Sequence, residues 1–288
     1  MDSTSFGLVG ESKTEKNGRQ AGWDLACKAD AAGKPAYLLC QMIRVVTFDA
    51  AGTLIRLTKS PGVTYAEAAR PFGYELDPKR LQAAFRIAWQ TLPPPAESSE
   101  PRADDDRGWW KMLVTRTMQE AGYEVAPFNT YFDEVYSAFA RPGIWELFPD
   151  VPVLLRQLVR LKIRLGVISN FDRRLYTILE DLDLLRAFEN IIISSESGVS
   201  KPAARIFLEA ARRFQVNPGE ILHIGDDANL DGAGAIAAGC KAFVVDHETT
   251  RLERLLELLG RKSRNHNACT PLRRGVPILG TPEQTGGK

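Results

Sequence analysis

Three short apolar segments, each followed closely by a polar side chain, constrain the fold of this chain most strongly. They are residues 43–48 (IRVVTF, then Asp49), residues 163–168 (IRLGVI, then Ser169) and residues 221–224 (ILHI, then Gly225 and Asp226). Continuous runs of this length that are rich in Val and Ile are typical of strands buried on both faces. Helical patterns separate the three segments, and strands that alternate with helices predict a parallel sheet with helices on both sides.

The other elements expected in the same part of the chain continue this alternation. Two further strands are expected at residues 191–193 and 242–245, and helices at residues 151–161, 174–181, 203–214, 231–238 and 249–259. Residues 42–57 and 142–260 are therefore predicted to form one α/β core with a Rossmann-like parallel sheet. In such sheets ligands bind beyond the carboxyl ends of the strands, where Asp49, Ser169 and Asp226 stand.

Residues 58–141 interrupt this pattern and are predicted to form a helical cap inserted into the core. Apolar residues recur at helical spacing over residues 65–72, 81–89, 109–121 and 131–139, and no segment between them has the pattern of a strand. A loop rich in Pro and charged residues separates the second helix from the third. Its acidic run, residues 104–106, is expected to be solvated or to begin the next helix. Helical spacing favours packing within the cap over a pocket lining for four aromatic residues, Tyr65, Trp89, Trp109 and Trp110.

The two ends of the chain show no sustained periodicity. Residues 1–41 are polar and rich in small residues, which predicts a flexible N-terminal arm, or an extension upstream of a folded part that begins at Met42. Residues 261–288 combine basic residues with Gly and Pro, which predicts a disordered basic tail.

Composition excludes several classes of function. Hydrophobic residues make up 44% and charged residues 25% of the chain, as in ordinary globular proteins. The 37 Lys and Arg residues against 36 Asp and Glu residues give a net charge of +1, so no nucleic-acid partner is expected. No apolar run is long enough for a membrane span, so no membrane partner is expected either. Four scattered cysteines without a CxxC motif argue against a disulfide framework or a zinc site, and a cytoplasmic location is expected.

The segment FDAAGTL supplies the first chemistry of the expected site. Asp49 could act as a carboxylate nucleophile at the end of its strand. Gly52 would permit the tight turn that follows, and Thr53 would offer a hydroxyl and a backbone N–H to an anion. Taken alone, an aspartate after a strand is more often a turn or helix-cap residue, so the prediction depends on what the other segments add.

Three later segments supply complementary groups. Ser169 and Asn170 offer a hydroxyl and an amide, and Lys201 offers a fixed positive charge just before a helix. Asp226 offers a second carboxylate, with Asp231 close behind. Two carboxylates from different strand ends, surrounded by oxygen donors, suit Mg²⁺. The cation, together with Lys201 and the hydroxyls of Thr53 and Ser169, would offset the charge on a phosphoryl group during transfer. Each residue alone fits a turn, a cap or a surface loop, but their order at successive strand ends favours a site.

Four motifs in this order resemble those of the haloacid dehalogenase-like hydrolase superfamily, in the branch whose helical cap follows the first motif. They are FDAAGTL, VISNFDRRL, SKPAARIF and HIGDDANLDGAGAIAAG, and the resemblance spans about residues 43–246. It implies an α/β core with an inserted cap and Mg²⁺-dependent hydrolysis of a small phosphorylated metabolite. In this architecture the core performs the phosphoryl chemistry, whereas the cap decides which substrate fits.

The resemblance also assigns roles to the site residues. It implies that Asp49 is the nucleophile and forms an aspartyl-phosphate. It implies that Mg²⁺ is held by Asp49, by the backbone carbonyl of Ala51 and by Asp226. Asp231 would support the metal shell. The residues that it implies in phosphate binding are Thr53, Ser169 and Lys201, of which Lys201 would also orient the nucleophile.

One position departs from the pattern of the phosphatases in that superfamily. They carry a second aspartate two residues after the nucleophile, which serves as general acid and base, and here that residue is Ala51. General acid–base catalysis contributes about 10²–10⁴-fold, so phosphates with poor leaving groups should be hydrolysed slowly. Acyl phosphates and activated aryl esters should be affected less, because their leaving groups depart without a proton.

Three alternatives stay open at this point. The 2-haloacid dehalogenases also lack that aspartate, but they use no metal and their pattern does not keep the carboxylate found here at Asp226. Phosphonoacetaldehyde hydrolases share the Asp-x-Ala-Gly-Thr turn but need a cap lysine that forms a Schiff base, and the predicted cap contains Lys59, Lys79 and Lys111. A catalytically weak binding or assembly module would explain Ala51, although it would not require the other site residues together.

Overall fold

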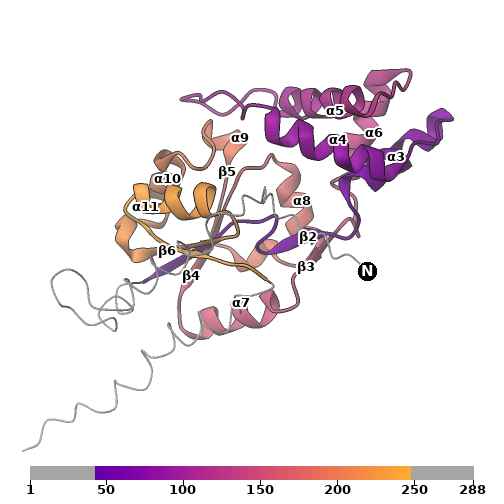
Figure 1. The fold of residues 1–288 in the computed structure, drawn as a ribbon. Coiled ribbons are helices and arrows are strands. Elements are labelled where there is room, and N and C mark those ends of the chain that lie inside the picture. Colours follow the sequence, from indigo (N-terminus) through magenta and orange to yellow (C-terminus); the bar gives the residue numbers. More distant parts are fainter. Residues whose placement is uncertain (1–42, 248–288) are drawn as a thin grey trace, which may run out of the picture.

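A computed structural model describes residues 43–247, which form a five-stranded parallel sheet with a helical insert at one end (Figure 1). The strand order is β5-β4-β1-β6-β7. The strands are β1 (Val45–Phe48), β4 (Arg164–Ser169), β5 (Asn190–Ile193), β6 (Ile221–Gly225) and β7 (Lys241–Val244). The predicted α/β class and the five predicted strands are confirmed, with bounds that differ by one or two residues.

Two layers of helices cover the sheet, because successive side chains of each strand point to opposite faces. On one face, Val46 and Phe48 of β1 pack with α7 (Val151–Arg160) and α8 (Arg174–Asp181). On the other face, Val45 packs with α10 (Ala204–Phe214) and α11 (Gly234–Ala237). The central strand β1 is buried throughout, so the chain that follows it emerges at the middle of the sheet edge.

Short helical turns complete the core. They are α9 (Ser194–Ser197), 3₁₀ turns at Leu185–Ala187 and Pro218–Glu220, and a π-helical turn at Ala228–Ala233. The π-helical turn and α11 together replace the single helix predicted over residues 231–238.

Several sequence predictions concern residues outside the described part of the chain. They are the N-terminal arm (residues 1–41), the terminal helix (residues 249–259) and the basic tail (residues 261–288). Within residues 43–247, no helix is long and apolar enough to cross a membrane.

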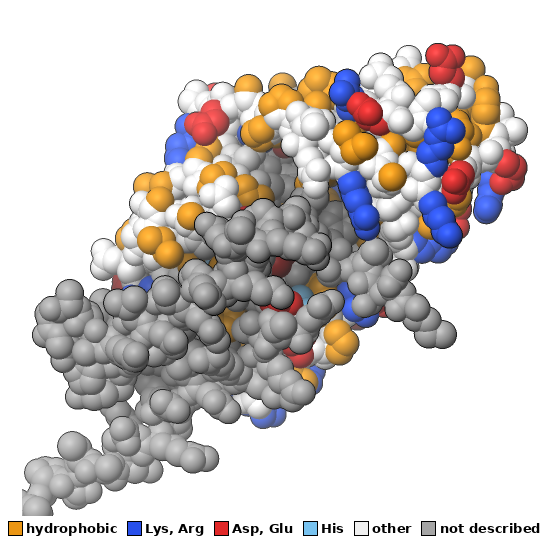
Figure 2. All heavy atoms as spheres, in the orientation of Figure 1, with side chains coloured by type: hydrophobic (Ala, Val, Ile, Leu, Met, Phe, Trp, Pro, Cys, Tyr) orange, Lys and Arg blue, Asp and Glu red, His pale blue; other side chains and the backbone are white. Residues whose placement is uncertain are grey.

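On the face drawn in Figure 2, the basic and acidic side chains of the insert are interspersed.

A two-stranded antiparallel ribbon joins the insert to the core, and no sequence pattern indicated it. The ribbon consists of β2 (Ile55–Leu57) and β3 (Trp145–Leu147), and three residues are too few to show a period of two. Ile55 pairs with Leu147, which brings the two ends of the insert together. The insert is therefore connected to the core just after Asp49.

The insert contains four helices, one in each segment for which a helix is predicted. They are α3 (Pro61–Ala69, followed by a 3₁₀ turn at Arg70–Phe72), α4 (Pro78–Thr91), α5 (Arg107–Ala121) and α6 (Phe128–Ala138). Helices α3 and α4 begin earlier than predicted, because Pro61 and Pro78 occupy the first turn, where proline is favoured. The four aromatic residues singled out above join an apolar cluster within the insert, where Tyr65 is buried and the three tryptophans are partly buried.

The loop between α4 and α5, residues 92–106, crosses from the insert to the core, and we call it the strap (Figure 1). The backbone N–H of Ser98 donates to the carbonyl of Gly198 at 2.7 Å, and that of Arg102 donates to the carbonyl of Ser195 at 2.8 Å. Gly198 has a φ of +68°, and a Cβ at this position would meet the carbonyl oxygens of Ser98 and Glu100. Glycine is therefore required where the strap touches the core.

Arg102 of the strap, whose side chain is only 9% exposed, holds Asp106. Its guanidinium donates to Asp106 Oδ2 at 3.1 Å and to the carbonyl of Ser194 at 2.9 Å. Helix α5 begins directly after the acidic run, as expected, but Asp106 is only 6% exposed and is not solvated. Burial raises the pKa of Asp106 to about 6, and the charge of Arg102 opposes this shift.

The Arg102→Met variant is expected to lose roughly 3 kcal/mol of unfolding free energy at pH 8, because it leaves the Asp106 carboxylate buried without a counter-charge. At pH 5 the loss should be smaller, since Asp106 can then bind a proton. Arg116→Met is a matched control in α5, because Arg116 pairs with Glu120 at an exposed position, where an ion pair contributes less than about 1 kcal/mol. Urea unfolding at both pH values measures these losses, and equal losses in the two variants would contradict the buried role of Arg102.

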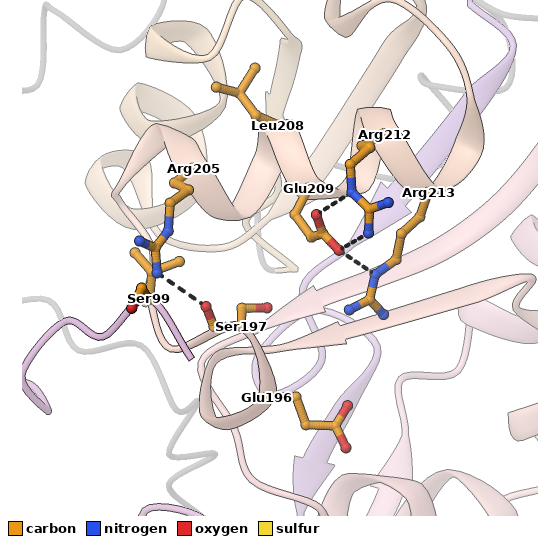
Figure 3. A pocket seen from close by; sticks show the side chains of 9 residues that line it. Ser99, Glu196, Ser197, Arg205, Leu208, Glu209, Arg212 and Arg213 are labelled. Atoms are coloured by element: carbon orange, nitrogen blue, oxygen red, sulfur yellow. Dashed lines mark hydrogen bonds and ion pairs between the residues drawn. The ribbon is translucent and has the colours of Figure 1, made fainter. Parts of the chain in front are cut away.

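A surface cavity of about 440 Å³ lies between the strap, α9 and α10 (Figure 3). On its wall, Glu209 pairs with Arg212 at 2.7 Å and with Arg213 at 2.8 Å. Arg205 donates to the carbonyl of Ser197 at 3.2 Å. Neighbouring protein groups thus engage these charged side chains, and none of the residues that line the cavity belongs to the predicted site.

Candidate active site

The candidate site lies at the carboxyl edge of the sheet, where the neighbouring strands β4, β1 and β6 end. Asp49 follows β1, Ser169 is the last residue of β4, and Asp226 follows β6. Hydrogen bonds connect these side chains to three further residues that the sequence singles out, Thr53, Lys201 and Asp231. The structure therefore brings together residues from all four motifs.

Two donors hold the carboxylate of Asp49. Lys201 Nζ lies 2.5 Å from Asp49 Oδ1, and the hydroxyl of Ser169 donates to the same oxygen at 3.1 Å. The residue is only 6% exposed, and burial raises the pKa of Asp49 although the Lys201 ammonium opposes the shift. Within residues 43–247 no donor engages Asp49 Oδ2, so this oxygen is the one available to a ligand.

Lys201 is fixed through its backbone as well as its side chain. Its N–H donates to Asn170 Oδ1 at 2.7 Å, and Asn170 Nδ2 donates back to the Lys201 carbonyl at 3.0 Å. This geometry differs from the sequence expectation that Asn170 offers a free amide to substrate, because both ends of that amide bond the Lys201 backbone. Asn170 thus positions Lys201, whose side chain is buried between Asp49 and Asp231.

Asp226 lies against the turn that follows Asp49. The hydroxyl of Thr53 donates to Asp226 Oδ1 at 3.1 Å. Gly52 has a φ of +96°, and a Cβ there would meet the Asp226 carboxylate, so glycine is required at this position. Burial, and then the charges of Asp49 and Asp231, raise the pKa of Asp226 to about 7.

These raised pKa values indicate a site that favours a cation. The buried carboxylate of Asp226 is repelled by that of Asp49, and a divalent cation between them would offset this repulsion. Among residues 43–247, no group of three or more His, Cys, Asp or Glu side chains could hold a metal ion. A cation bound by these two carboxylates would complete its shell with backbone carbonyl and water oxygens, as Mg²⁺ commonly does.

Ala51 offers its carbonyl and nothing else to such a cation. The hydrogen bonds of the turn are made by the carbonyl of Ala50 and the N–H of Gly52, and the Ala51 carbonyl takes part in none of them. The methyl side chain of Ala51 is half-buried and packs against the core. The position that the family pattern gives to a general acid is thus apolar here.

Asp231 bonds protein groups with both of its oxygens. Oδ1 lies 2.6 Å from Lys201 Nζ and 3.0 Å from His223 Nε2, and Oδ2 accepts from the N–H of Asp227 at 3.1 Å. Burial alone would raise the pKa of Asp231, but Lys201 and His223 outweigh burial and hold it well below the usual range. This geometry favours indirect support through Lys201 over direct metal binding. Asp227 caps the π-helical turn.

The family model of haloacid dehalogenase-like hydrolases matches residues 43–239. The chain belongs to this family. This hydrolase is 35% identical over 212 residues to haloacid dehalogenase-like hydrolase domain-containing protein 3 of Bos taurus, and the match covers 70% of the chain and 82% of that relative. The resemblance carried by the four motifs is therefore confirmed.

Solved structures of other proteins share the fold of this hydrolase. The structure of YfnB from Bacillus subtilis, described as bound to magnesium, has a TM-score of 0.59 and 20% identity, and the match covers 76% of this chain and 99% of YfnB. A 2-haloacid dehalogenase from Pseudomonas syringae has a TM-score of 0.51 and 25% identity, and the match covers 77% of this chain and all of the other (100%). Family membership therefore establishes a hydrolase without separating phosphatase from dehalogenase chemistry.

Two polar residues beneath the site fall outside its predicted constellation. Thr47 Oγ1 lies 3.0 Å from His223 Nδ1, and His223 Nε2 bonds Asp231. Thr47 and His223 are register partners in β1 and β6. The sequence does contain a signal for them, because each is a polar residue within an otherwise apolar strand of the haloacid dehalogenase-like core.

Proposed function

We propose that this hydrolase is a Mg²⁺-dependent phosphatase that acts on small phosphorylated metabolites through an aspartyl-phosphate on Asp49. The observation that carries the proposal is the position of the Asp49 carboxylate, which Lys201 and Ser169 hold at one oxygen beside the second carboxylate of Asp226. This arrangement supplies a fixed nucleophile, a fixed positive charge and a cation site within one buried cluster.

In the proposed reaction, an oxygen of the Asp49 carboxylate forms a bond to phosphorus while the bond from phosphorus to the leaving oxygen breaks. A water molecule then attacks the phosphorus of the aspartyl-phosphate, which releases phosphate and restores the carboxylate. Lys201 favours the ionised carboxylate of Asp49 before the attack and holds its Oδ1 in place. When bound by Asp49, Asp226 and the Ala51 carbonyl, Mg²⁺ supplies charge that offsets the phosphoryl oxygens.

The proposal predicts a preference for good leaving groups, because Ala51 cannot protonate a departing alkoxide. The rate on acetyl phosphate divided by the rate on a simple alkyl phosphate should be about 10²–10⁴-fold larger than in a phosphatase that has the general acid. Steady-state rates on both substrates, with Mg²⁺ and with EDTA, measure this preference. Equal Mg²⁺-dependent rates on the two substrates would remove the role given to Ala51.

A binding or assembly module is the alternative from another functional class. Beryllofluoride, which mimics a phosphoryl group on a carboxylate, separates the two. Mg²⁺-dependent formation of a beryllofluoride adduct on Asp49 supports the phosphatase. The absence of binding at millimolar beryllofluoride, together with no turnover of acetyl phosphate, would favour the module.

Dehalogenation is the second candidate reaction, and Ala51 together with the structural likeness to a 2-haloacid dehalogenase favours testing it. Asp226 weighs against it, since a second buried carboxylate beside the nucleophile would repel a released halide. Halide release from a panel of halocarboxylates, compared with phosphate release by the same sample, distinguishes the two reactions.

The environments of two insert lysines, Lys59 and Lys111, do not support the phosphonatase alternative. Lys59 pairs with Glu67 at 2.9 Å, and Lys111 donates to Asn129 at 2.8 Å, both at exposed positions. A lysine that forms a Schiff base needs a lowered pKa, which burial or a neighbouring cation would provide. Lys59 is exposed and lies beside a carboxylate, which is neither of these settings.

A further inference from the structure

A line of buried polar side chains runs from the middle of the sheet to the candidate nucleophile. Thr47 Oγ1 lies 3.0 Å from His223 Nδ1, and His223 Nε2 lies 3.0 Å from Asp231 Oδ1. Lys201 Nζ lies 2.6 Å from that same Asp231 oxygen and 2.5 Å from Asp49 Oδ1. All five residues are buried, and Thr47 and His223 have no exposed surface.

Packing alone does not account for Thr47 and His223. They face each other in β1 and β6, whose other side chains are apolar. Burying polar groups costs free energy unless each group is hydrogen-bonded, so an apolar pair would satisfy the core more simply. The His223 ring also meets Phe207 edge to face, with 5.1 Å between the ring centroids, as a purely aromatic residue could.

The partners of the imidazole define its tautomer. An ionised carboxylate only accepts hydrogen bonds, so His223 must donate to Asp231 from Nε2. Burial lowers the pKa of His223 although Asp231 opposes the shift, so the ring is neutral and Nδ1 accepts from the Thr47 hydroxyl. Asp231 therefore selects the tautomer whose N–H points at it, and Thr47 partners the other ring nitrogen.

We propose that His223 is a positioning residue, which fixes the Asp231 carboxylate that holds Lys201 against Asp49. The inference rests on the proposed function, because Asp49 and Lys201 act there as nucleophile and fixed charge. Without the N–H of His223, the Asp231 carboxylate keeps, among residues 43–247, only Lys201 and the N–H of Asp227 as partners and can turn. Supporting hydrogen bonds of this kind typically change activity about 10–100-fold.

Four variants separate positioning from packing. His223→Phe keeps a planar ring and removes both nitrogen atoms, whereas His223→Gln keeps a side-chain N–H. Thr47→Val keeps the shape of the side chain and removes the hydroxyl. Phe207→Leu is the matched control, since it disturbs the packing around His223 and leaves the polar line intact.

Kinetics on acetyl phosphate give the first readout. We expect His223→Phe to lower kcat about 10–100-fold with KM changed less than about threefold, and His223→Gln to recover part of this loss. Phe207→Leu should lower the melting temperature and keep kcat. An unchanged kcat in His223→Phe, or a loss as large in Phe207→Leu, overturns the inference. If His223→Phe does not fold, Thr47→Val replaces it with the same expected direction.

Nuclear magnetic resonance without substrate separates this inference from the proposed function. The ¹⁵N spectrum should show His223 neutral and protonated at Nε2, and protonation at Nδ1 alone would overturn the inference. The side-chain ammonium signal of Lys201, identified by its loss in Lys201→Met, should shift in Thr47→Val and stay in place in Phe207→Leu. Shifts without any turnover would contradict the proposed function but support the positioning role of His223. Turnover without shifts would contradict only the positioning role of His223.

Discussion

Replacing Asp49 with asparagine is expected to lower Mg²⁺-dependent hydrolysis of acetyl phosphate at least about 10⁴-fold and to abolish beryllofluoride binding. The amide keeps the size of the side chain but offers no carboxylate oxygen to phosphorus. Its carbonyl can still accept from Lys201 and Ser169, which donate to Asp49 in the parent protein. Single-turnover rates and ¹⁹F spectra of beryllofluoride measure the two losses.

Asp227→Asn is the matched control for this variant. Asp227 carries a neighbouring carboxylate that caps the π-helical turn, where it accepts from the N–H groups of Asn229 at 2.7 Å and Leu230 at 2.8 Å. Asparagine caps helices about as well as aspartate, so this variant should keep activity within about threefold. Activity in Asp49→Asn close to that of Asp227→Asn would rule out Asp49 as the nucleophile.

Stability distinguishes a lost nucleophile from a misfolded protein. Because burial raises the pKa of Asp49, its ionisation makes the folded state less stable as pH rises above the ordinary carboxyl range. The asparagine variant does not ionise, so it should be at least as stable as the parent protein at pH 8 without Mg²⁺. Mg²⁺ should raise the melting temperature of the parent more than that of the variant.

The sheet and the nucleophile position could be predicted from sequence because their signals are local. Each core strand is a short run of Val, Ile or Leu buried on both faces, and the polar residue after it must lie at the carboxyl edge. This reasoning places Asp49, Ser169 and Asp226 correctly on neighbouring strands. Lys201 also reaches the site as expected, because the residues before α10 return to the same edge.

Features that depend on contacts between distant segments could not be predicted in the same way. The β2–β3 ribbon forms because the two ends of the insert meet, and three residues carry no period. Asp106 resembles a solvated acid in the sequence, but Arg102 and the strap bury it against the core. Asn170 resembles a ligand-binding amide until its two hydrogen bonds to the Lys201 backbone are seen.

Introducing an aspartate at position 51 is expected to raise turnover of simple alkyl phosphates about 10²-fold or more, within the range that general acid–base catalysis contributes. Ala51 is half-buried at the beginning of the turn after Asp49, so a carboxyl group there keeps contact with solvent and can exchange protons. Acetyl phosphate turnover should change much less, since its leaving group needs no proton. The gain should therefore be specific to poor leaving groups.

Ala51→Asn separates proton transfer from shape at this position. Asparagine has the size and polarity of aspartate but no carboxyl proton to give to an alkoxide, so Ala51→Asn should leave alkyl phosphate turnover near the parent rate. The pH–rate profile of Ala51→Asp on an alkyl phosphate should also gain a descending limb where the new acid loses its proton. Equal gains in the two variants would show that Ala51 limits turnover by its size. No gain in either would place the limit at another step, such as substrate entry past the insert.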